Sequence, residues 1–216
     1  MPFSSVKPCG PGRPKDLEKR AAILCAAKRL FPRGGFEGTS MDAIAAEAGV
    51  SKLTVYSHFK DKETLFFRAI RARCEEQMPE TLFDVDVAGP LPEQLEAIAR
   101  AFFALVTAPD ALALHRLLVA RSGASDRLVE LFLEAGPEVV LAGFEEFLQR
   151  HIRVGRLDIA DAPRAAQQFL SLIKGELHAR LLCGCTRPVQ QEEIDAHIRA
   201  AVEFFLRAYG KRTLPA

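Results

Sequence analysis

Residues 49–62, GVSKLTVYSHFKDK, decide the fold because their composition disagrees with their surroundings. The middle of this stretch, from Leu53 to Phe59, is rich in β-branched and aromatic residues, which are typical of a strand. The segments on both sides carry the apolar period of 3.6 residues that is typical of helices. If the stretch is also helical, its poor helix propensity must be offset by tertiary packing and by an N-cap.

The residues before the stretch favour the helical interpretation. A short amphipathic helix begins after the N-cap Ser40 and ends at Gly49, where the chain must reverse within a few residues. Ser51 can cap a second helix, in which Val55 and Phe59 recur at i and i+4 and therefore face inward. Two short helices joined by a tight turn are the pattern of a helix-turn-helix.

The outward side chains of the second helix are mostly hydrogen-bond donors and cations, which suit phosphates and base edges. No carboxylate occurs along this segment before Asp61, whereas a surface selected only for solubility usually mixes both signs. The segment therefore predicts a surface for a polyanion. Its outward residues are Lys52, Leu53, Thr54, Tyr56, Ser57 and His58.

The charge distribution agrees with this interpretation. The 216 residues carry a net charge of +1, but residues 1–74 hold 14 Lys and Arg against 7 Asp and Glu, a net of +7. Residues 75–216 hold 15 against 21, a net of −6. A basic head on an acidic body predicts a polyanion at one end only, although charge asymmetry alone is equally compatible with an ordinary solvated surface.

The composition is that of a soluble globular protein without a membrane partner. The chain has no run of 18 apolar residues, and its start, MPFSSVKPCGPGRPK, lacks the apolar core of a signal peptide. The start is expected to be a disordered basic leader. Five scattered cysteines do not form a disulfide framework, so a reducing, cytoplasmic location is expected.

Nearly every segment combines helical periodicity with a stop signal, which predicts an all-α fold. The first helix should run from Asp16 to about Phe31, end at Pro32 and Gly34-Gly35, and bury a stripe that includes Leu17. Asp61 should cap a helix that runs to about residue 78. A loop at 84–92 then marks a domain boundary. Further helices are expected at 92–107, 110–122, 126–135, 137–153, 162–183 and 190–209.

The last two helices have wider apolar faces than a monomeric surface helix needs. Two such helices from each of two subunits would build a four-helix interface with two-fold symmetry. A single well-buried helix pair within one subunit is the alternative. The expected interface residues are Leu172, Gly175, Ala179, His197, Ala201, Phe204 and Ala208.

A family resemblance covers the same residues. FEGTSMDAIAAEAGVSKLTVYSHFKDKETLF, at 36–66, closely resembles the DNA-binding domain of the TetR (tetracycline-repressor) family of bacterial transcriptional regulators, over about residues 16–76. Three later pieces more weakly resemble its AefR-like C-terminal branch: AGPEVVLAGFEEFL (135–148), AAQQFLSLIKGELHARLLCG (165–184) and HIRAAVEFFLRAYG (197–210).

The resemblance implies a three-helix DNA-binding domain at 16–76, preceded by a flexible basic arm at 1–15. It implies a larger helical domain at 77–216 for effector binding and dimerisation. Two positions depart from the family pattern: Leu53 is bulkier than usual, and Pro32 stands where the first helix normally continues. The implied contacts to double-stranded DNA are Arg13, Thr39, Ser40, Lys52, Leu53, Thr54, Tyr56, Ser57, His58 and Lys62.

The function implied is that of a homodimeric regulator, a repressor released from a pseudo-palindromic operator by an unknown small-molecule effector. The same DNA-binding head can also serve an activator. No cofactor is expected to be required. Apolar effector pockets need aromatic side chains and a few polar groups. The candidate pocket residues, each of which could equally be core, are Phe102, Phe103, His115, Phe144, Phe147, His151 and Phe169.

Other chemistry has weaker support. Cys183 and Cys185 near His178 lack the second ligand pair of a closed zinc site, so no metal is expected, and helix-terminal thiols are favoured. Cys25 and Cys74 fall at core spacing and are expected to act as small apolar residues. No nucleophile elbow, Walker loop or zinc-protease motif is present, so an enzyme is not expected. A small-molecule-binding or redox-sensing protein remains the alternative.

Overall fold

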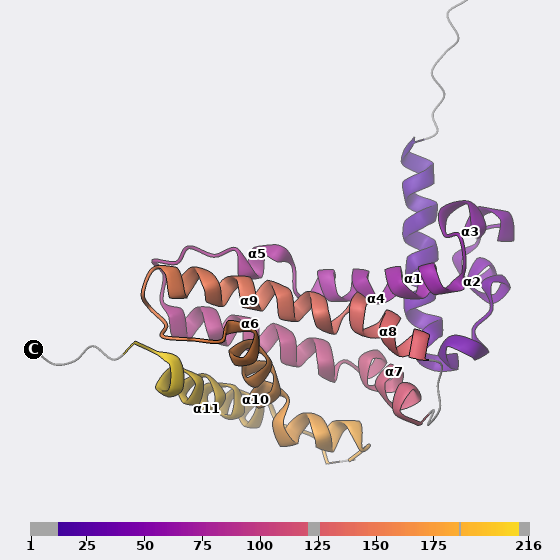
Figure 1. The fold of residues 1–216 in the computed structure, drawn as a ribbon. Coiled ribbons are helices and arrows are strands. Elements are labelled where there is room, and N and C mark those ends of the chain that lie inside the picture. Colours follow the sequence, from indigo (N-terminus) through magenta and orange to yellow (C-terminus); the bar gives the residue numbers. More distant parts are fainter. Residues whose placement is uncertain (1–12, 121–125, 186, 212–216) are drawn as a thin grey trace, which may run out of the picture. The chain divides into compact units, whose positions relative to one another are not determined.

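A computed structural model describes residues 13–120, 126–185 and 187–211, except for the side chains of 13–15 and 126. These residues form helices and no strand (Figure 1), so the predicted all-α class is confirmed. The helices are α1 (Arg13–Gly38), α2 (Met41–Ala48), α3 (Lys52–His58), α4 (Lys62–Gln77), α5 (Glu80–Phe83), α6 (Leu91–Thr107), α7 (Pro109–Ala120), α8 (Asp126–Ala135), α9 (Pro137–Arg153), α10 (Ala162–Leu182) and α11 (Gln191–Tyr209).

The chain divides into two compact units, Met1–Ala69 and Ile70–Ala216, with the division inside α4. Residues 84–92, which were expected to mark a domain boundary, lie within the second unit. In the described part of the chain no single helix is long and apolar enough to cross a membrane. Only α6 and α7 together reach that length and composition, and they are bent by 60° at their junction.

The first unit is held together by aromatic side chains from α1, α3 and α4. Val55 and Phe59 of the α3 region are buried, as their spacing predicts. Phe31 of α1 meets Phe66 of α4 edge to face, with ring centroids 5.0 Å apart. Aromatic pairs of this kind contribute about 0.5–1.5 kcal/mol beyond the burial of their area. This packing explains how α3 remains helical despite its composition.

Helix α1 differs from its prediction in two ways. It continues through Pro32 and changes direction at Gly35, which has a φ of 69° and is one of the two glycines that were expected to end it. Proline costs a helix about 3 kcal/mol, and the burial of neighbouring Phe31 helps to offset that cost. The predicted apolar stripe is also wrong in part, because Leu17 is 63% exposed and the buried face is formed by Ile23, Ala26, Ala27 and Phe31.

The second unit is built around a continuous set of aromatic rings contributed by α9, α10 and α11. Ring centroids are 5.7 Å apart for Phe144 and Phe147, 4.7 Å for Phe144 and Phe169, and 5.0 Å for Phe169 and Phe205. All four side chains are fully buried. Phe83 on the short helix α5, which the sequence did not predict, covers this core beside Gly143.

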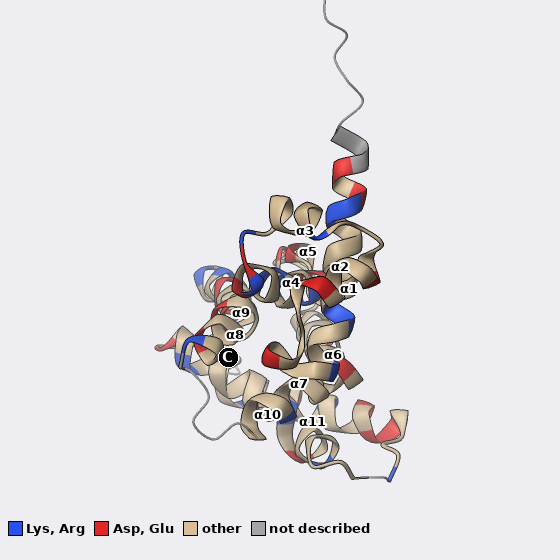
Figure 2. Ribbon diagram, turned by 90° about the vertical axis from the view of Figure 1, so that its right-hand side faces the viewer, with Lys and Arg blue, Asp and Glu red and all other residues tan. Residues whose placement is uncertain are grey.

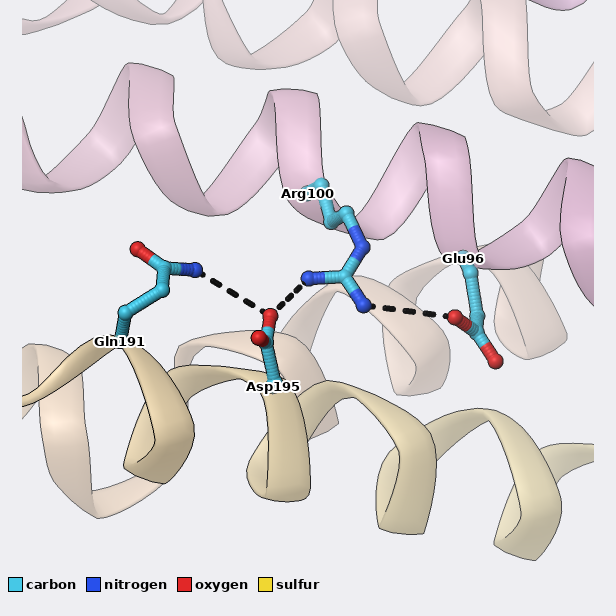
Figure 3. A network of polar contacts seen from close by, with 4 residues as sticks. All are labelled: Glu96, Arg100, Gln191 and Asp195. Atoms are coloured by element: carbon cyan, nitrogen blue, oxygen red, sulfur yellow. Dashed lines mark hydrogen bonds and ion pairs between the residues drawn. The ribbon is translucent and has the colours of Figure 1, made fainter.

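A polar network joins α6 to α11 at the edge of this core (Figure 3). Arg100 on α6 pairs with Asp195 on α11 and lies 3.4 Å from Glu96 one turn away. Gln191 donates a second hydrogen bond to Asp195, at 3.1 Å. The hydrogen bond from Arg100, followed by that from Gln191, holds the pKa of Asp195 below its ordinary value. The network therefore fixes the register of α11 against α6.

Helix α10 is broken at Gly175, whose φ of 48° and ψ of −156° are accessible to glycine and strained for other residues. The break frees the carbonyl of Ile173, which accepts a hydrogen bond of 2.8 Å from Nε2 of His197 on α11. A Cβ at position 175 would lie 2.6 Å from Cε1 of His197. Glycine is therefore required here by backbone conformation and by close packing within one subunit.

Candidate nucleic-acid interface

The helix-turn-helix is built by the local signals that the sequence contains. The Oγ of Ser40 accepts a hydrogen bond of 3.1 Å from Ala43 N–H, which caps α2. Gly49 ends α2 in the left-handed conformation, with a φ of 65°. The Oγ of Ser51 then accepts a 3.1 Å hydrogen bond from Thr54 N–H and caps α3. The predicted caps at both serines and the predicted stop at Gly49 are confirmed.

Helix α3 presents a small, mixed outer face. Leu53 is 82% exposed and Tyr56 is 44% exposed. Lys52 and Ser57 are also exposed. Thr54 is half-buried, and its hydroxyl lies 2.9 Å from Oγ of Ser51. The face therefore offers one apolar side chain, one aromatic hydroxyl and one ammonium group.

Carboxylates from other helices reach this surface, contrary to the expectation from the segment alone. Asp42 of α2 lies 2.9 Å from Nζ of Lys52, and this hydrogen bond raises the pKa of the lysine. Asp16 of α1 lies 3.1 Å from Nε2 of His58. In Figure 2 the upper end of α1 carries red acidic bands beside blue basic ones. Sequence reasoning missed Asp42 because the partners are ten residues apart and meet only through the fold.

Three predicted contact residues are engaged inside the first unit. Thr39 is only 3% exposed, and its hydroxyl donates to the carbonyl of Leu30 at 3.3 Å. The His58 side chain is 9% exposed and faces α1 rather than outward. Lys62 lies over the ring of Phe36, with Nζ 4.3 Å from the centroid. Cation–π contacts of this kind contribute about 0.5–1 kcal/mol at exposed sites.

Five predicted contact residues are exposed at the N-cap of α2 and on α3: Ser40, Lys52, Leu53, Tyr56 and Ser57. Thr54 borders this group. The side chain of Arg13, and residues 1–12 of the predicted basic arm, lie outside the described residues. We call the five exposed residues the α3 surface.

The predicted effector residues fall into two groups. The five phenylalanines and His151 are buried and contribute to the core of the second unit. The ring of His151 packs against that of Phe147 at a tilt of 52°, with centroids 4.5 Å apart, and neither of its ring nitrogens has a hydrogen-bond partner among the described residues. Burial lowers its pKa. His115 is separate: it lies on α7 and faces His178 of α10.

The predicted interface residues are likewise divided. Phe204 is 59% exposed on α11, and Ala179, Ala208 and Gly175 are also exposed. Leu172 is half-buried. Ala201 is buried in the core, and His197 is held by Ile173 within the same subunit. The exposed members are small residues of α10 and α11 and the one large ring of Phe204.

Four cysteines lie within the described residues, and all four are free thiols. Within the described ranges no three His, Cys, Asp or Glu side chains are grouped to hold a metal ion. Cys183 and Cys185 are exposed at the end of α10. Cys74 is buried as expected, and burial raises its pKa to about 11. Cys25 is exposed, so its expected place in the core is wrong, because α1 turns a different face inward.

Comparisons with known proteins identify both parts of the chain. The family model described as "Bacterial regulatory proteins, tetR family" matches residues 23–69. The model described as "AefR-like transcriptional repressor, C-terminal domain" matches residues 93–211. The flavonoid-responsive regulator FrrA is similar in structure, with a TM-score of 0.71 and 36% identity, over 90% of this chain and 98% of that one.

Two further relatives match different shares of this chain. A TetR-family transcriptional regulator from Mesorhizobium loti has a TM-score of 0.78 and 28% identity, over 91% of this chain and 99% of that one. The transcriptional activator FasR of Mycolicibacterium smegmatis is 31% identical over 90 residues, 42% of this chain and 41% of FasR. The chain spans less than half the length of the curated relatives that match it first.

Proposed function

This chain belongs to the TetR family of bacterial transcriptional regulators, and we propose that it is a homodimeric repressor released from a pseudo-palindromic operator by a small molecule. The family and its relatives are regulators rather than enzymes, as the sequence predicts. Regulators of this family generally need no cofactor and bind small-molecule effectors.

The observation that carries the DNA-binding proposal is the α3 surface. A seven-residue helix of poor propensity is capped at Ser51 and anchored by two buried side chains, while Leu53 and Tyr56 remain exposed. A leucine and a tyrosine exposed side by side with a lysine combine the apolar and hydrogen-bonding groups that read base edges. In the major groove, Leu53 would contact a thymine methyl and Lys52 and Tyr56 would reach base edges or phosphates. Arg13 and residues 1–15 would add a minor-groove arm.

Dimerisation would place two α3 surfaces in successive major grooves. Half-sites about 34–36 Å apart, or a multiple of that spacing, follow from the helical repeat of DNA. The exposure of Phe204, Ala179 and Ala208 supports an interface built from α10 and α11. Phe204→Glu should then yield monomers at micromolar concentration in light scattering. Val154→Glu, which changes another exposed apolar residue of the second unit, should leave the dimer intact.

The effector proposal rests on the second unit and on the family. FrrA is named for its response to flavonoids, which are aromatic, and the core here is rich in phenylalanine. An effector that binds the DNA-free form more tightly must weaken DNA binding by the same factor, because linkage is reciprocal. FasR is named as an activator, so a reporter assay with and without the protein decides the sign of regulation.

A gel-shift titration of the protein's own upstream region tests DNA binding. Lys52→Ala combined with Tyr56→Ala should weaken the complex by about tenfold to a hundredfold, the range expected for lost base contacts. Arg164→Ala, which removes an exposed cation of the second unit, is the control and should bind as the wild type does. Equal binding by the double variant contradicts the assignment of α3. No salt-dependent shift at all would favour the sensor alternative.

A further inference from the structure

Lys60 is an exposed lysine in the link between α3 and α4, and sequence reasoning did not select it as a contact residue. Both of its neighbours are anchored. Phe59, the C-cap of α3, is buried, and the carboxylate of Asp61 accepts the 2.7 Å hydrogen bond from Thr64 N–H that starts α4. The backbone of Lys60 is therefore held in place while its side chain remains exposed.

Lys52 and Lys62, the two predicted lysine contacts, already have partners within the first unit. The ammonium of Lys52, at the N-terminal end of α3, lies 2.9 Å from Asp42. Lys62, on the first turn of α4, lies over the ring of Phe36, and its Nζ is 4.0 Å from Glu37. The charges of both lysines are therefore partly compensated before any DNA is bound.

Two further basic side chains lie where α1 packs against the C-terminal end of α3. Nε2 of His58 is 3.1 Å from Asp16, and the His58 side chain is almost buried. The guanidinium of Arg20 on α1 lies 5.2 Å from the centroid of the Phe59 ring. Lys60, by contrast, forms no ion pair with any side chain that the structure describes. Among the described residues at this end of α3, its ammonium is therefore the group available to an outside anion.

The length of α3 brings this end of the helix to the level of DNA phosphates. A recognition helix in a major groove contacts base edges with its N-terminal residues. The seven residues of α3 span about 10 Å, and the major groove is about 8.5 Å deep. With Lys52 and Leu53 at the base edges, Lys60 therefore lies near the phosphates that border the groove. The C-terminal end of a helix carries a partial negative charge, which repels a phosphate unless a cation is present.

We propose that Lys60 of each subunit neutralises a DNA phosphate beside the C-terminal end of α3. The inference rests on the proposed function, since it requires that α3 enters a major groove. A phosphate contact carries no sequence information by itself, so Lys60 fixes the position of α3 in the groove while Leu53 and Tyr56 read bases. Loss of Lys60 should weaken binding to every duplex by a similar factor.

The salt dependence of DNA binding provides the test, because each neutralised phosphate contributes about −0.9 to the slope of log K against log salt concentration. Fluorescence anisotropy between about 50 and 200 mM salt would compare the protein's own upstream region with a shuffled duplex of the same composition. Lys60→Gln should reduce the magnitude of the slope by about 0.9 for each bound subunit, on both duplexes. Lys60→Arg, which keeps the charge, should restore the slope.

Two other lysines serve as comparisons. Lys211→Gln changes an exposed lysine of the second unit and should keep the wild-type slope. Lys62→Gln should reduce the slope by less than Lys60→Gln does, because the Lys62 ammonium already lies over Phe36 and close to Glu37.

The proposal is overturned if Lys60→Gln keeps the wild-type slope on both duplexes while its circular dichroism is unchanged. It is also overturned if the variant loses affinity for the upstream region alone, since Lys60 would then be a base contact. In both cases the wild-type protein still binds its upstream region, so the proposed regulator stands. If the wild type binds neither duplex even at low salt, the proposed function fails together with this contact.

Discussion

Gly175→Ala should be among the most damaging single-methyl changes in this protein. Its φ of 48° and ψ of −156° lie in a region that costs a residue with a Cβ about 1–3 kcal/mol. The new Cβ would also lie 2.6 Å from Cε1 of His197, so the ring must move. Moving it breaks the hydrogen bond to Ile173, which contributes about 1 kcal/mol. The expected loss of unfolding free energy is therefore about 2–4 kcal/mol.

Urea unfolding followed by circular dichroism, at one fixed protein concentration, measures this loss. A chain of this length loses about 2–4 °C of melting temperature per kcal/mol, so thermal scans should show a fall of about 5–15 °C. Gly184→Ala is the matched control, because Gly184 also has a positive φ, of 79°, but open space around it. Gly184→Ala should lose about 1–2 kcal/mol of unfolding free energy, which is the cost of the backbone strain without a clash.

A double-mutant cycle separates the two causes. With His197→Ala in place, Gly175→Ala should cost less than it does alone, by about 1 kcal/mol or more, because nothing remains for the Cβ to meet. Equal costs of Gly175→Ala and Gly184→Ala, together with additive effects in the cycle, would refute the packing argument. A Gly175→Ala protein as stable as the wild type would refute the backbone argument as well.

Three further predictions concern capping and ionisation. Asp61→Ala removes the 2.7 Å hydrogen bond from Thr64 N–H that starts α4 and should cost about 1 kcal/mol in urea unfolding, whereas Asp61→Asn should cost less. The hydrogen bonds from Thr64 lower the pKa of Asp61 in the folded protein from its ordinary value of 3.8. The stability that Asp61 contributes is therefore complete above pH 3.8 and is lost as the pH falls through the lower pKa of the folded state. Asp61→Asn should make the free energy of unfolding less dependent on pH in this acidic range. Cys74, with a pKa of about 11, should resist alkylation at pH 8 until the protein unfolds, and rapid labelling of the native protein would contradict its burial. Burial lowers the pKa of His115 and His178 in the folded protein from 6.5. The unfolded chain therefore binds protons at a higher pH than the folded protein, and the melting temperature should fall as the pH drops below about 6.5. His178→Gln should reduce this dependence of the melting temperature on pH.

The parts of the fold that depend on neighbouring residues were predictable from the sequence. Ser40, Gly49, Ser51 and Asp61 each act on backbone groups within three or four residues, and all four begin or end helices as predicted. The inward placement of Val55 and Phe59 follows from their spacing in the same way. Local hydrogen bonds and helical periodicity depend only on residues that are close in the sequence. They can therefore be predicted without knowledge of the fold.

The features that depend on distant residues were not predictable. Pro32 was wrongly expected to end α1, because the cost of a lost hydrogen bond is visible in the sequence and the packing of Phe31 on Phe66 is not. The break of α10 at Gly175 depends on where the ring of His197 lies. The contact residues of the α3 surface remain a prediction, although the fold places His58 against Asp16 rather than outward.

The ion pair of Lys52 with Asp42 bears on how the proposed regulator would search a chromosome. Non-specific binding arises almost wholly from phosphate neutralisation and counterion release. A lysine already paired with a carboxylate releases fewer counterions from an arbitrary stretch of duplex, and the exposed Asp42 repels nearby phosphates. Residence on non-target DNA should therefore be short. Contacts of Leu53 and Tyr56 with matching bases do not depend on the charge of Lys52 and would lengthen it at the operator, so specificity would come from these contacts rather than from phosphate neutralisation.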